Sequence, residues 1–229
     1  MRKLMVSTFV SLDGVMQAPG GPDEDPRGGF TLGGWTVPYF DEALGAEMDD
    51  IFAQPFDLLL GRRTYDIFAA HWPHVPLEPG QPGYDPGSVD IARKFNACAK
   101  HVATHRPESL AWQNSHALGP DVAAAVRVLK GQDGPTLLVQ GSSELLQILF
   151  AHGLVDEARL LVMPVVLGKG LRLFGGGALP AAFHLTHSFA TPAGVLVARY
   201  RLAGEVQTGS FALEVPTEAE VERRQALGG

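Results

Sequence analysis

Residues 135–170 hold the pattern that most constrains this 229-residue chain: an apolar run, a glycine turn, a helical period and a second apolar run. The run at 136–139 contains only Thr, Leu and Val, as in a short strand that is buried on both faces. From Glu144 onward apolar residues recur at the spacing of one helix face, and another apolar segment covers 158–163. This order of strand, turn, helix and strand predicts an α/β protein with a mostly parallel sheet.

The glycine turn consists of Gly141, Ser142 and Ser143, between the first of these strands and the helix. Open α/β sheets hold ligands at the carboxyl ends of their strands, and N–H groups at a helix start attract anions such as phosphate. Gly141 would let a ligand approach closely, because it has no Cβ atom. The two serines can bond a phosphate oxygen or, equally well, cap an ordinary helix.

Composition indicates an ordinary globular chain that is long enough to bury a core without disulfides or metals. Hydrophobic residues make up 45% and charged residues 19%, and the net charge of −7 argues against nucleic-acid binding. Cys98 is the only cysteine, which excludes an intrachain disulfide and a thiolate metal cluster. We expect no metal site, because the histidines form no HExxH motif and Pro73 separates His71 from His74.

The N-terminal segment indicates a first strand rather than a targeting peptide, because its apolar run is short and interrupted by polar residues. No stretch approaches the length of a membrane span. We therefore expect a cytoplasmic protein with no membrane partner.

Periodicity and turn residues divide the rest of the chain into further elements. Strands are predicted at 3–10, 56–60, 100–104 and 211–215, and helices at 39–54, 62–71, 91–97, 120–130 and 217–220. Residues 17–34 form a long loop rich in glycine and proline, which in a compact domain is usually functional or mobile. Phe30 and Trp35 in this region either stack on a ligand or close as a lid on the core.

Residues 183–191 and 195–202 predict an antiparallel hairpin, because both alternate polar with apolar residues and a Pro-Ala-Gly turn joins them. Strict alternation would put four residues of the first strand on one face: Phe183, Leu185, His187 and Phe189. The second strand keeps apolar groups on both faces, which is more than the edge of a sheet needs. We expect the C-terminal tail or a second subunit to cover this surface.

Residues that attract anions follow three predicted strand ends. They are Gly61, Arg62, Arg63 and Thr64; then Thr104, His105 and Arg106; and then Gly141, Ser142 and Ser143. Arginine pairs with phosphate through two parallel hydrogen bonds, although a single arginine is more simply interpreted as a surface charge. Three such ends in one parallel sheet favour a ligand with several phosphates spread over some length, as in a dinucleotide.

Four motifs occur in an order that resembles a known family. They are Ser11-Leu12-Asp13-Gly14, Leu60-Gly61-Arg62-Arg63-Thr64-Tyr65, Val139-Gln140-Gly141-Ser142-Ser143 and Pro164-Val165-Val166-Leu167-Gly168-Lys169-Gly170. On these motifs residues 3–202 resemble the dihydrofolate reductase superfamily, in the branch of the C-terminal reductase domain of the bacterial bifunctional riboflavin-biosynthesis enzyme. The resemblance implies a three-layer fold, a mostly parallel central sheet with an antiparallel C-terminal hairpin, and a homodimer. The chain then divides into a reductase domain at 1–203 and a C-terminal extension at 204–229.

The same resemblance implies an NADPH-dependent reductase that transfers a hydride to a small substrate. The substrate would be a pterin-like or pyrimidine-like heterocycle, or a carbonyl or imine compound. Implied cofactor contacts are Gly61, Arg62, Arg63, Thr64, Thr104, His105, Arg106, Gly141, Ser142, Ser143, Glu144 and Leu167. The third strand ends in Thr-His-Arg-Pro, where relatives more often show Ser-Arg-Thr near the adenosine 2′-phosphate.

On the substrate side we expect Asp13, Phe30 and Trp35. Trp35, Pro38 and Asp41 echo the order of loop and carboxylate in dihydrofolate reductases, with Asp41 one residue further along. Asp41 is either the catalytic acid or a helix-start acid that the helix dipole stabilises. The alternative function is a non-catalytic, dimeric dinucleotide-binding protein on the same fold.

Overall fold

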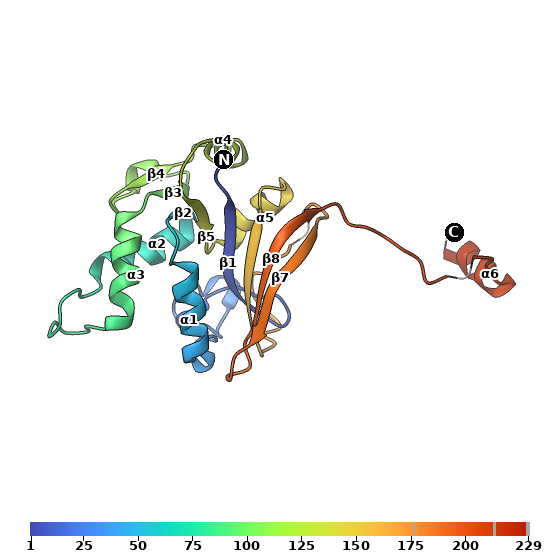
Figure 1. Cartoon of the computed structure of the whole chain (residues 1–229), viewed down its shortest axis with the longest axis horizontal. Helices are drawn as coiled ribbons and strands as arrows, with labels where there is room; N and C mark the ends of the chain where they lie inside the picture. Colours follow the sequence, from blue (N-terminus) through green and yellow to red (C-terminus); the bar gives the residue numbers. More distant parts are fainter. Residues whose placement is uncertain (176, 213, 228–229) are drawn as a thin grey trace.

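A computed structural model describes residues 1–175, 177–212 and 214–227 of the chain. Its described strands form one sheet in the order β4-β3-β2-β5-β1-β6-β8-β7 (Figure 1). The strands are β1 (Leu4–Ser11), β2 (Phe56–Gly61), β3 (Lys100–Ala103), β4 (Ser115–Ala117), β5 (Thr136–Val139), β6 (Glu157–Met163), β7 (Ala182–Ala190) and β8 (Leu196–Gly204). The α-helices are α1 (Glu42–Ile51), α2 (Arg62–His71), α3 (Pro86–Ala97), α4 (Val122–Gly131), α5 (Ser143–Ala151) and α6 (Glu218–Leu227). Short 3-10 turns lie at Arg27–Gly29, Val37–Tyr39, Trp72–His74 and Pro107–Ser109.

The sheet is parallel from β4 to β6, and β8 runs antiparallel to both β6 and β7. This arrangement confirms the predicted α/β fold with an antiparallel C-terminal hairpin. β1 occupies the middle of the sheet, where Val6 pairs with Val139 on one side and Ala158 on the other. A central strand of this kind is covered on both faces, which explains why the residues of β1 are nearly all buried and mostly apolar.

Helices cover the two faces of the sheet and make three layers. Leu4 and Val6 of β1 join a buried cluster with residues of α4 and α5. Met5 points the other way and joins a cluster with residues of α1, α2 and α3. This alternation follows the two-residue period of a strand.

Aspartates mark the starts of three helices. Asp41, Asp85 and Asp121 cap α1, α3 and α4 by accepting a backbone N–H of the first turn, at 2.8, 3.2 and 2.9 Å. The helix predicted at 91–97 therefore starts too late, because Asp85 and the following Pro86 already form the start signal of α3.

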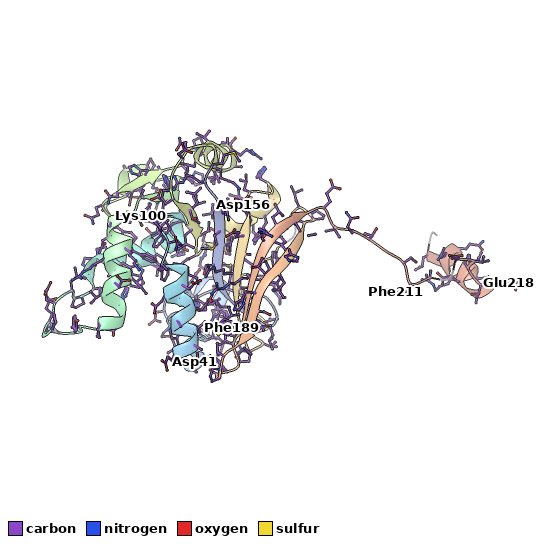
Figure 2. The ribbon with its side chains drawn as sticks, viewed as in Figure 1. Asp41, Lys100, Asp156, Phe189, Phe211 and Glu218 are labelled. Atoms are coloured by element: carbon purple, nitrogen blue, oxygen red, sulfur yellow. The ribbon has the colours of Figure 1, made fainter. Side chains whose placement is uncertain are left out.

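Two short segments depart from the sequence predictions. β4 has only three residues, half buried or exposed, and so has no apolar run that would predict a strand. The strand predicted at 211–215 is wrong for residues 211, 212, 214 and 215, and residue 213 lies outside the described residues. After β8 the chain leaves the body of the molecule, so that Phe211 and Glu218 lie well apart from it (Figure 2).

A β-bulge in β7 changes which side chains share a face of the hairpin. The pairing sets Phe183 and Leu185 opposite Leu202 and Tyr200, and then sets His187 and Phe189 opposite Arg199 and Val197. The prediction of one face for all four residues of β7 is therefore wrong. The extra residue between Leu185 and His187 reverses the alternation.

A buried ion pair network fastens α1 to the antiparallel strands. The side chain of Glu47 is 1% exposed, and its Oε1 accepts hydrogen bonds from Arg159 of β6 at 3.2 Å and Arg199 of β8 at 3.1 Å. Arg199 also bonds the second carboxylate oxygen, and Asp50 pairs with both arginines at the more exposed edge. These bonds compensate for the removal of the charges from water.

We predict that Glu47→Gln lowers the free energy of unfolding by roughly 2–4 kcal/mol, because two half-buried arginines lose their buried charged partner and keep only Asp50 at the more exposed edge. Urea unfolding followed by circular dichroism measures this loss. Asp49→Asn, on the exposed side of the same helix, should change stability by less than about 0.5 kcal/mol. Equal effects of the two substitutions would show that the network does not hold α1.

Candidate functional site

The carboxyl ends of β3, β2 and β5 lie side by side, as the sequence predicted for its three anion-attracting turns. The backbone N–H of Gly61 donates to the carbonyl of Gly141 at 3.1 Å. Nη1 of Arg62 donates to Oγ1 of Thr104 at 3.3 Å. These bonds join the three turns into one rim.

Two glycines allow the turns of this rim to approach closely. A Cβ atom on Gly61 would lie 2.8 Å from the backbone nitrogen of Ser142. Gly141 has a φ of +148°, and its Cβ would lie 2.6 Å from Oγ1 of Thr64. The peptide bond between Gly141 and Ser142 is cis. Residues with side chains would therefore push the ends of β2 and β5 apart.

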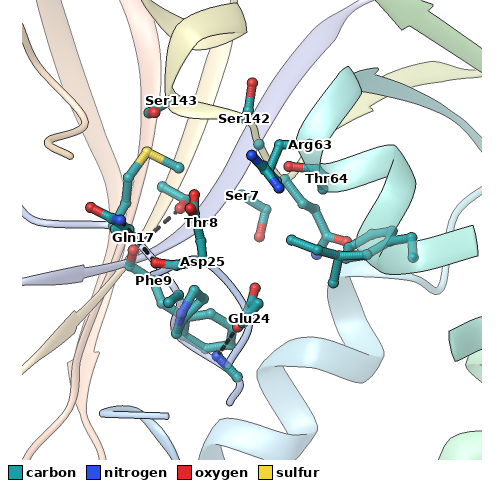
Figure 3. Close-up of a pocket in the computed structure, with 18 of the residues that line it drawn as sticks. Ser7, Thr8, Phe9, Gln17, Glu24, Asp25, Arg63, Thr64, Ser142 and Ser143 are labelled. Atoms are coloured by element: carbon teal, nitrogen blue, oxygen red, sulfur yellow. Dashed lines mark hydrogen bonds between the residues drawn. The ribbon is translucent and has the colours of Figure 1, made fainter. Parts of the chain in front are cut away.

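A pocket of about 350 Å³ opens beside the rim (Figure 3). Its volume lies in the range of small-molecule sites. The polar and charged side chains that line it include Ser7, Thr8, Gln17, Glu24, Asp25, Arg27, Arg63, Thr64, Ser142 and Ser143. They come from β1, the loop after it, the start of α2 and the turn before α5.

An ion pair joins the long loop to α5 at the edge of this pocket. Both oxygens of Asp25 accept hydrogen bonds from Arg27, at 2.8 Å from Nε and 2.7 Å from Nη2. These bonds lower the pKa of Asp25, so its carboxylate stays ionised. Nη1 of Arg27 donates to Glu144 at 2.7 Å, and the charge of Arg27 is therefore already matched.

Glu24 is the pocket carboxyl whose pKa is shifted in the opposite direction. Its Oε2 accepts backbone N–H groups of Gly20 at 2.6 Å and Gly21 at 3.1 Å. Burial raises the pKa of Glu24, because removal from water disfavours the charged form. The backbone bonds occupy Oε2, so Oε1 is the atom that can carry a proton toward a ligand.

Ser7 places a buried hydroxyl in the same pocket. The residue is 2% exposed, and its Oγ has no hydrogen-bond partner in the described part of the chain. Figure 3 shows this side chain pointing into the pocket, between the Glu24 and Asp25 side and the Arg63 and Thr64 side. Buried hydroxyl groups almost always have a partner, and at this place a water molecule or a ligand in the pocket can be the partner of Ser7.

Asp41 lies outside this pocket, at the start of α1 beside the hairpin turn (Figure 2). One of its oxygens accepts the N–H of Leu44 at 2.8 Å and the other accepts that of Ala193 at 2.9 Å. These backbone bonds lower the pKa of Asp41. Of the two roles that the sequence left open, the geometry matches the helix-start acid and gives Asp41 no contact with the pocket.

Phe30 and Trp35 pack in the core beneath the long loop. Both are less than 8% exposed, and Nε1 of Trp35 donates to the carbonyl of Gln17 at 2.8 Å. Neither ring lines the pocket beside the rim. The rings therefore hold the loop on the core, as in the lid interpretation.

Asp13 ties the end of β1 to the fourth sequence motif. It accepts the N–H of Leu167 at 3.0 Å and that of Gly168 at 2.9 Å. A hydrogen bond from the hydroxyl of Ser11 together with these backbone bonds lowers the pKa of Asp13 to about 2. Asp13 and Leu167 thus join these two segments and do not line the pocket.

The basic residues of the rim differ in three ways. Arg62 is engaged within the protein, with Nε donating to Asp66 at 2.9 Å and Nη1 to Ser109 at 2.6 Å. His105 and Arg106 are exposed beyond the pocket, next to Thr104. Arg63 does line the pocket, and within the described residues no acid lies at ion-pair distance from it.

Sequence reasoning missed the pocket residues on β1 and on the loop after it. Ser7, Gln17, Glu24, Asp25 and Arg27 follow no spacing that marks a site. The available signal was a polar Ser-Thr pair in the middle of an otherwise apolar central strand. A polar side chain there needs a partner or a ligand.

The residues that the structure describes contain neither a metal cluster nor a membrane helix. Within the described ranges, His, Cys, Asp and Glu form no group of three that could hold a metal ion. None of the helices found in those ranges has the length and apolar character needed to cross a bilayer.

The fold and the site together define an α/β domain with a small-molecule pocket at the carboxyl ends of its parallel strands. The sequence profile of the RibD C-terminal domain family matches residues 2–197. The chain therefore belongs to the RibD C-terminal domain family, and this membership supports a reductase-type function.

Related proteins share this fold at low sequence identity. The uncharacterized protein YyaP of Bacillus subtilis (strain 168) is 25% identical over 177 residues, which cover 76% of this chain and 80% of YyaP. A pyrimidine reductase-like protein from Corynebacterium diphtheriae superposes with a TM-score of 0.53 at 12% identity, over 90% of this chain and 93% of that one. A Thermotoga maritima diaminohydroxyphosphoribosylaminopyrimidine deaminase/5-amino-6-(5-phosphoribosylamino)uracil reductase gives 0.54 at 15% identity, over 88% of this chain and 57% of that one.

We predict that Gly141→Ala lowers the free energy of unfolding by about 1–3 kcal/mol, because the new Cβ meets Thr64 and the backbone conformation is one that only glycine adopts freely. Adding Thr64→Ala to Gly141→Ala should restore the stability that is lost through the contact with Thr64. It should not restore the stability that is lost through the backbone conformation. Urea titration of the two single variants and the double variant measures both parts. Wild-type stability of Gly141→Ala would contradict the close approach of the two turns.

Proposed function

We propose that this chain is an NADPH-dependent reductase that transfers a hydride to a small heterocyclic, carbonyl or imine substrate. The observation that carries the proposal is one pocket that joins an anion-attracting turn and an unpaired arginine to an acid with a raised pKa. Membership of the RibD C-terminal domain family supports the same reaction class. We propose that the enzyme acts in the cytoplasm.

The residues of the rim fit the phosphates of a dinucleotide. Gly141, Ser142 and Ser143 form a tight turn at the start of α5, where backbone N–H groups attract anions. Arg63 and Thr64 face that turn from the start of α2, and Arg63 brings a charge that no acid in the described ranges neutralises. We propose that these residues hold the cofactor phosphates, with Thr104, His105 and Arg106 further along the rim.

When bound, NADPH would supply a hydride to the substrate carbon and leave as NADP⁺. Glu24 would supply the proton that the substrate oxygen or nitrogen gains as its double bond to carbon is broken. Asp25 cannot take this part, because Arg27 keeps its carboxylate ionised. Enzymes often place two carboxyls side by side and shift their pKa values in opposite directions, so that one donates a proton while the other stays charged.

NADPH should bind more tightly than NADH, because Arg63 and Arg106 can meet the additional phosphate. Arg63→Ala should weaken NADPH binding by roughly 1.5–3 kcal/mol if it makes a charge-assisted contact. Isothermal titration calorimetry with both cofactors measures these differences. Arg93→Ala, an exposed arginine of α3, is the control and should bind NADPH like wild type. Equal affinities for the two cofactors, or binding of neither, would refute this assignment.

Glu24→Gln should lower kcat by about 10²–10⁴-fold, the usual contribution of a general acid, without weakening NADPH binding. In the wild type, kcat should fall as pH rises through the raised pKa of Glu24, because the carboxyl then loses its proton. That decline should vanish in the variant, and exposed Asp23→Asn should retain it. Unchanged kcat in Glu24→Gln would assign the proton to another donor. NADPH binding without oxidation of any substrate would favour the non-catalytic alternative.

We also propose that the chain forms a homodimer through its hairpin. Leu185, Leu196 and Leu202 are 46%, 48% and 37% exposed and lie on one face because of the bulge in β7. An apolar face of this kind is normally covered. The proposed division at residue 203 assigns this face to the reductase domain and leaves the tail, with exposed Phe211, as an addition to the contact.

If the chain forms a homodimer, light scattering at micromolar concentration should give a mass of about twice 24.5 kDa. Leu185→Glu should give the monomer mass, because a charge on the apolar face would be buried at the interface. His184→Glu, on the opposite face, should remain dimeric. A truncation after Gly204 that stays dimeric would show that the tail does not hold the interface, and a monomeric wild type would rule the dimer out.

A further inference from the structure

One part of the pocket is an aromatic lobe built by α1, α2, α3 and the turn between α2 and α3. Its centre is Phe95, whose ring centroid lies 5.3 Å from Phe52, 5.6 Å from Phe68 and 5.0 Å from Trp72. Phe40, Met48, Ile67 and Ile91 extend the apolar lining. Phe95 and Phe52 are buried beneath this lining, so the half-buried Phe68 and Trp72 and the exposed Phe40 offer the ring surface. Such a surface favours flat, apolar rings.

Cations are scarce around this lobe. Among the described residues that line the pocket, Arg27 and Arg63 are the only positive side chains. Asp25 and Glu144 already match the charge of Arg27, and Arg63 lies on the rim beside the phosphate-attracting turn. A phosphate on the substrate would thus enter an apolar surface without a partner, which is unfavourable.

Lys169 does not change this conclusion, because it lies in a neighbouring hollow behind Gln17. Nε2 of Gln17 donates to the carbonyls of Asp25 at 2.9 Å and Arg27 at 3.0 Å, and its Oε1 accepts the N–H of Leu171 at 2.9 Å. These bonds fix Gln17 as a wall between the two spaces.

Polar recognition in the pocket instead comes from uncharged groups that form hydrogen bonds. The unpartnered hydroxyl of Ser7 points into the pocket, toward the side where Glu24 lies (Figure 3). A ligand oxygen or nitrogen at this point would accept the Ser7 hydrogen bond. The ring that carries this atom could then contact the apolar lining.

We propose that the substrate is an uncharged, largely apolar ring compound whose carbonyl or imine group accepts a hydrogen bond from Ser7, and not a phosphorylated pyrimidine. This inference rests on the proposed reductase function, because it names the substrate class of the same pocket. Ser7 orients the group that is reduced, and the aromatic lobe holds the ring.

The first test compares three probes on the full chain by calorimetry. 1-Tetralone is an uncharged bicyclic ketone, tetralin is the same ring system without the carbonyl, and uridine 5′-monophosphate is a pyrimidine with a ribose phosphate. 1-Tetralone should bind at least about tenfold more tightly than uridine 5′-monophosphate, since only the latter brings a charged group into the lobe. The reverse order overturns the proposed substrate class.

The second test isolates the Ser7 hydroxyl. Ser7→Ala should weaken 1-tetralone binding by about 3–10-fold, as expected for one hydrogen bond, and leave tetralin binding unchanged. Ser115→Ala is the control, because it removes the other buried hydroxyl without a partner in the described ranges, on β4 away from the pocket. This substitution should change the binding of neither 1-tetralone nor tetralin. If Ser7→Ala weakens the binding of both probes equally, Ser7 contributes only packing and the proposed hydrogen bond is wrong. If Ser7→Ala does not fold, equal affinities of wild type for 1-tetralone and tetralin overturn the hydrogen bond directly.

Calorimetry with NADPH on the same protein separates the two hypotheses. Binding of 1-tetralone without binding of NADPH would refute the proposed function and leave the ligand class standing. Binding of NADPH with preference for uridine 5′-monophosphate would overturn the ligand class alone. Binding of neither NADPH nor 1-tetralone would overturn both.

Discussion

The close contact between the ends of β2 and β5 is the constraint on which the rest of the site depends. Gly61 and Gly141 bond through their backbones at 3.1 Å, and neither position has room for a Cβ atom. This contact brings the starts of α2 and α5 to the same rim. Arg63 and Thr64 can therefore face Ser142 and Ser143 across one pocket, although about eighty positions separate the two turns in the chain.

Four acidic residues, two in the pocket and two outside it, have pKa values that depend on their surroundings. Asp41 and Asp13 accept backbone N–H groups, which lower their pKa values and make them structural. Asp25 is held ionised by an arginine, whereas burial of Glu24 has the opposite effect on its pKa. The surroundings of these four acids therefore separate their pKa values, because residue type and position in the chain do not.

Membership of the RibD C-terminal domain family supports a reductase-type reaction, but it leaves the substrate open. The aromatic lobe around Phe95 and the scarcity of unpaired cations differ from what a phosphorylated pyrimidine would need. The anion-attracting turn and the aromatic lobe can thus have independent chemistry. The reason is that separate elements build the two parts: the strand ends hold the turn, and α1 to α3 line the lobe.

Local signals in the sequence determined the layers of this protein and the place of its rim. Apolar periodicity and turn residues are properties of neighbouring positions, so 136–139, 62–71 and the three anion-attracting strand ends could be predicted without a fold. The bulge in β7 could not be predicted in this way, because one extra residue in a strand is recognised only from its pairing with the neighbouring strand. The tertiary structure alone decided that Glu24 and Ser7 meet in a pocket and that Asp41 caps a helix beside the hairpin. A pKa shift and an unpartnered hydroxyl depend on groups that are distant in the chain, and only packing brings those groups together.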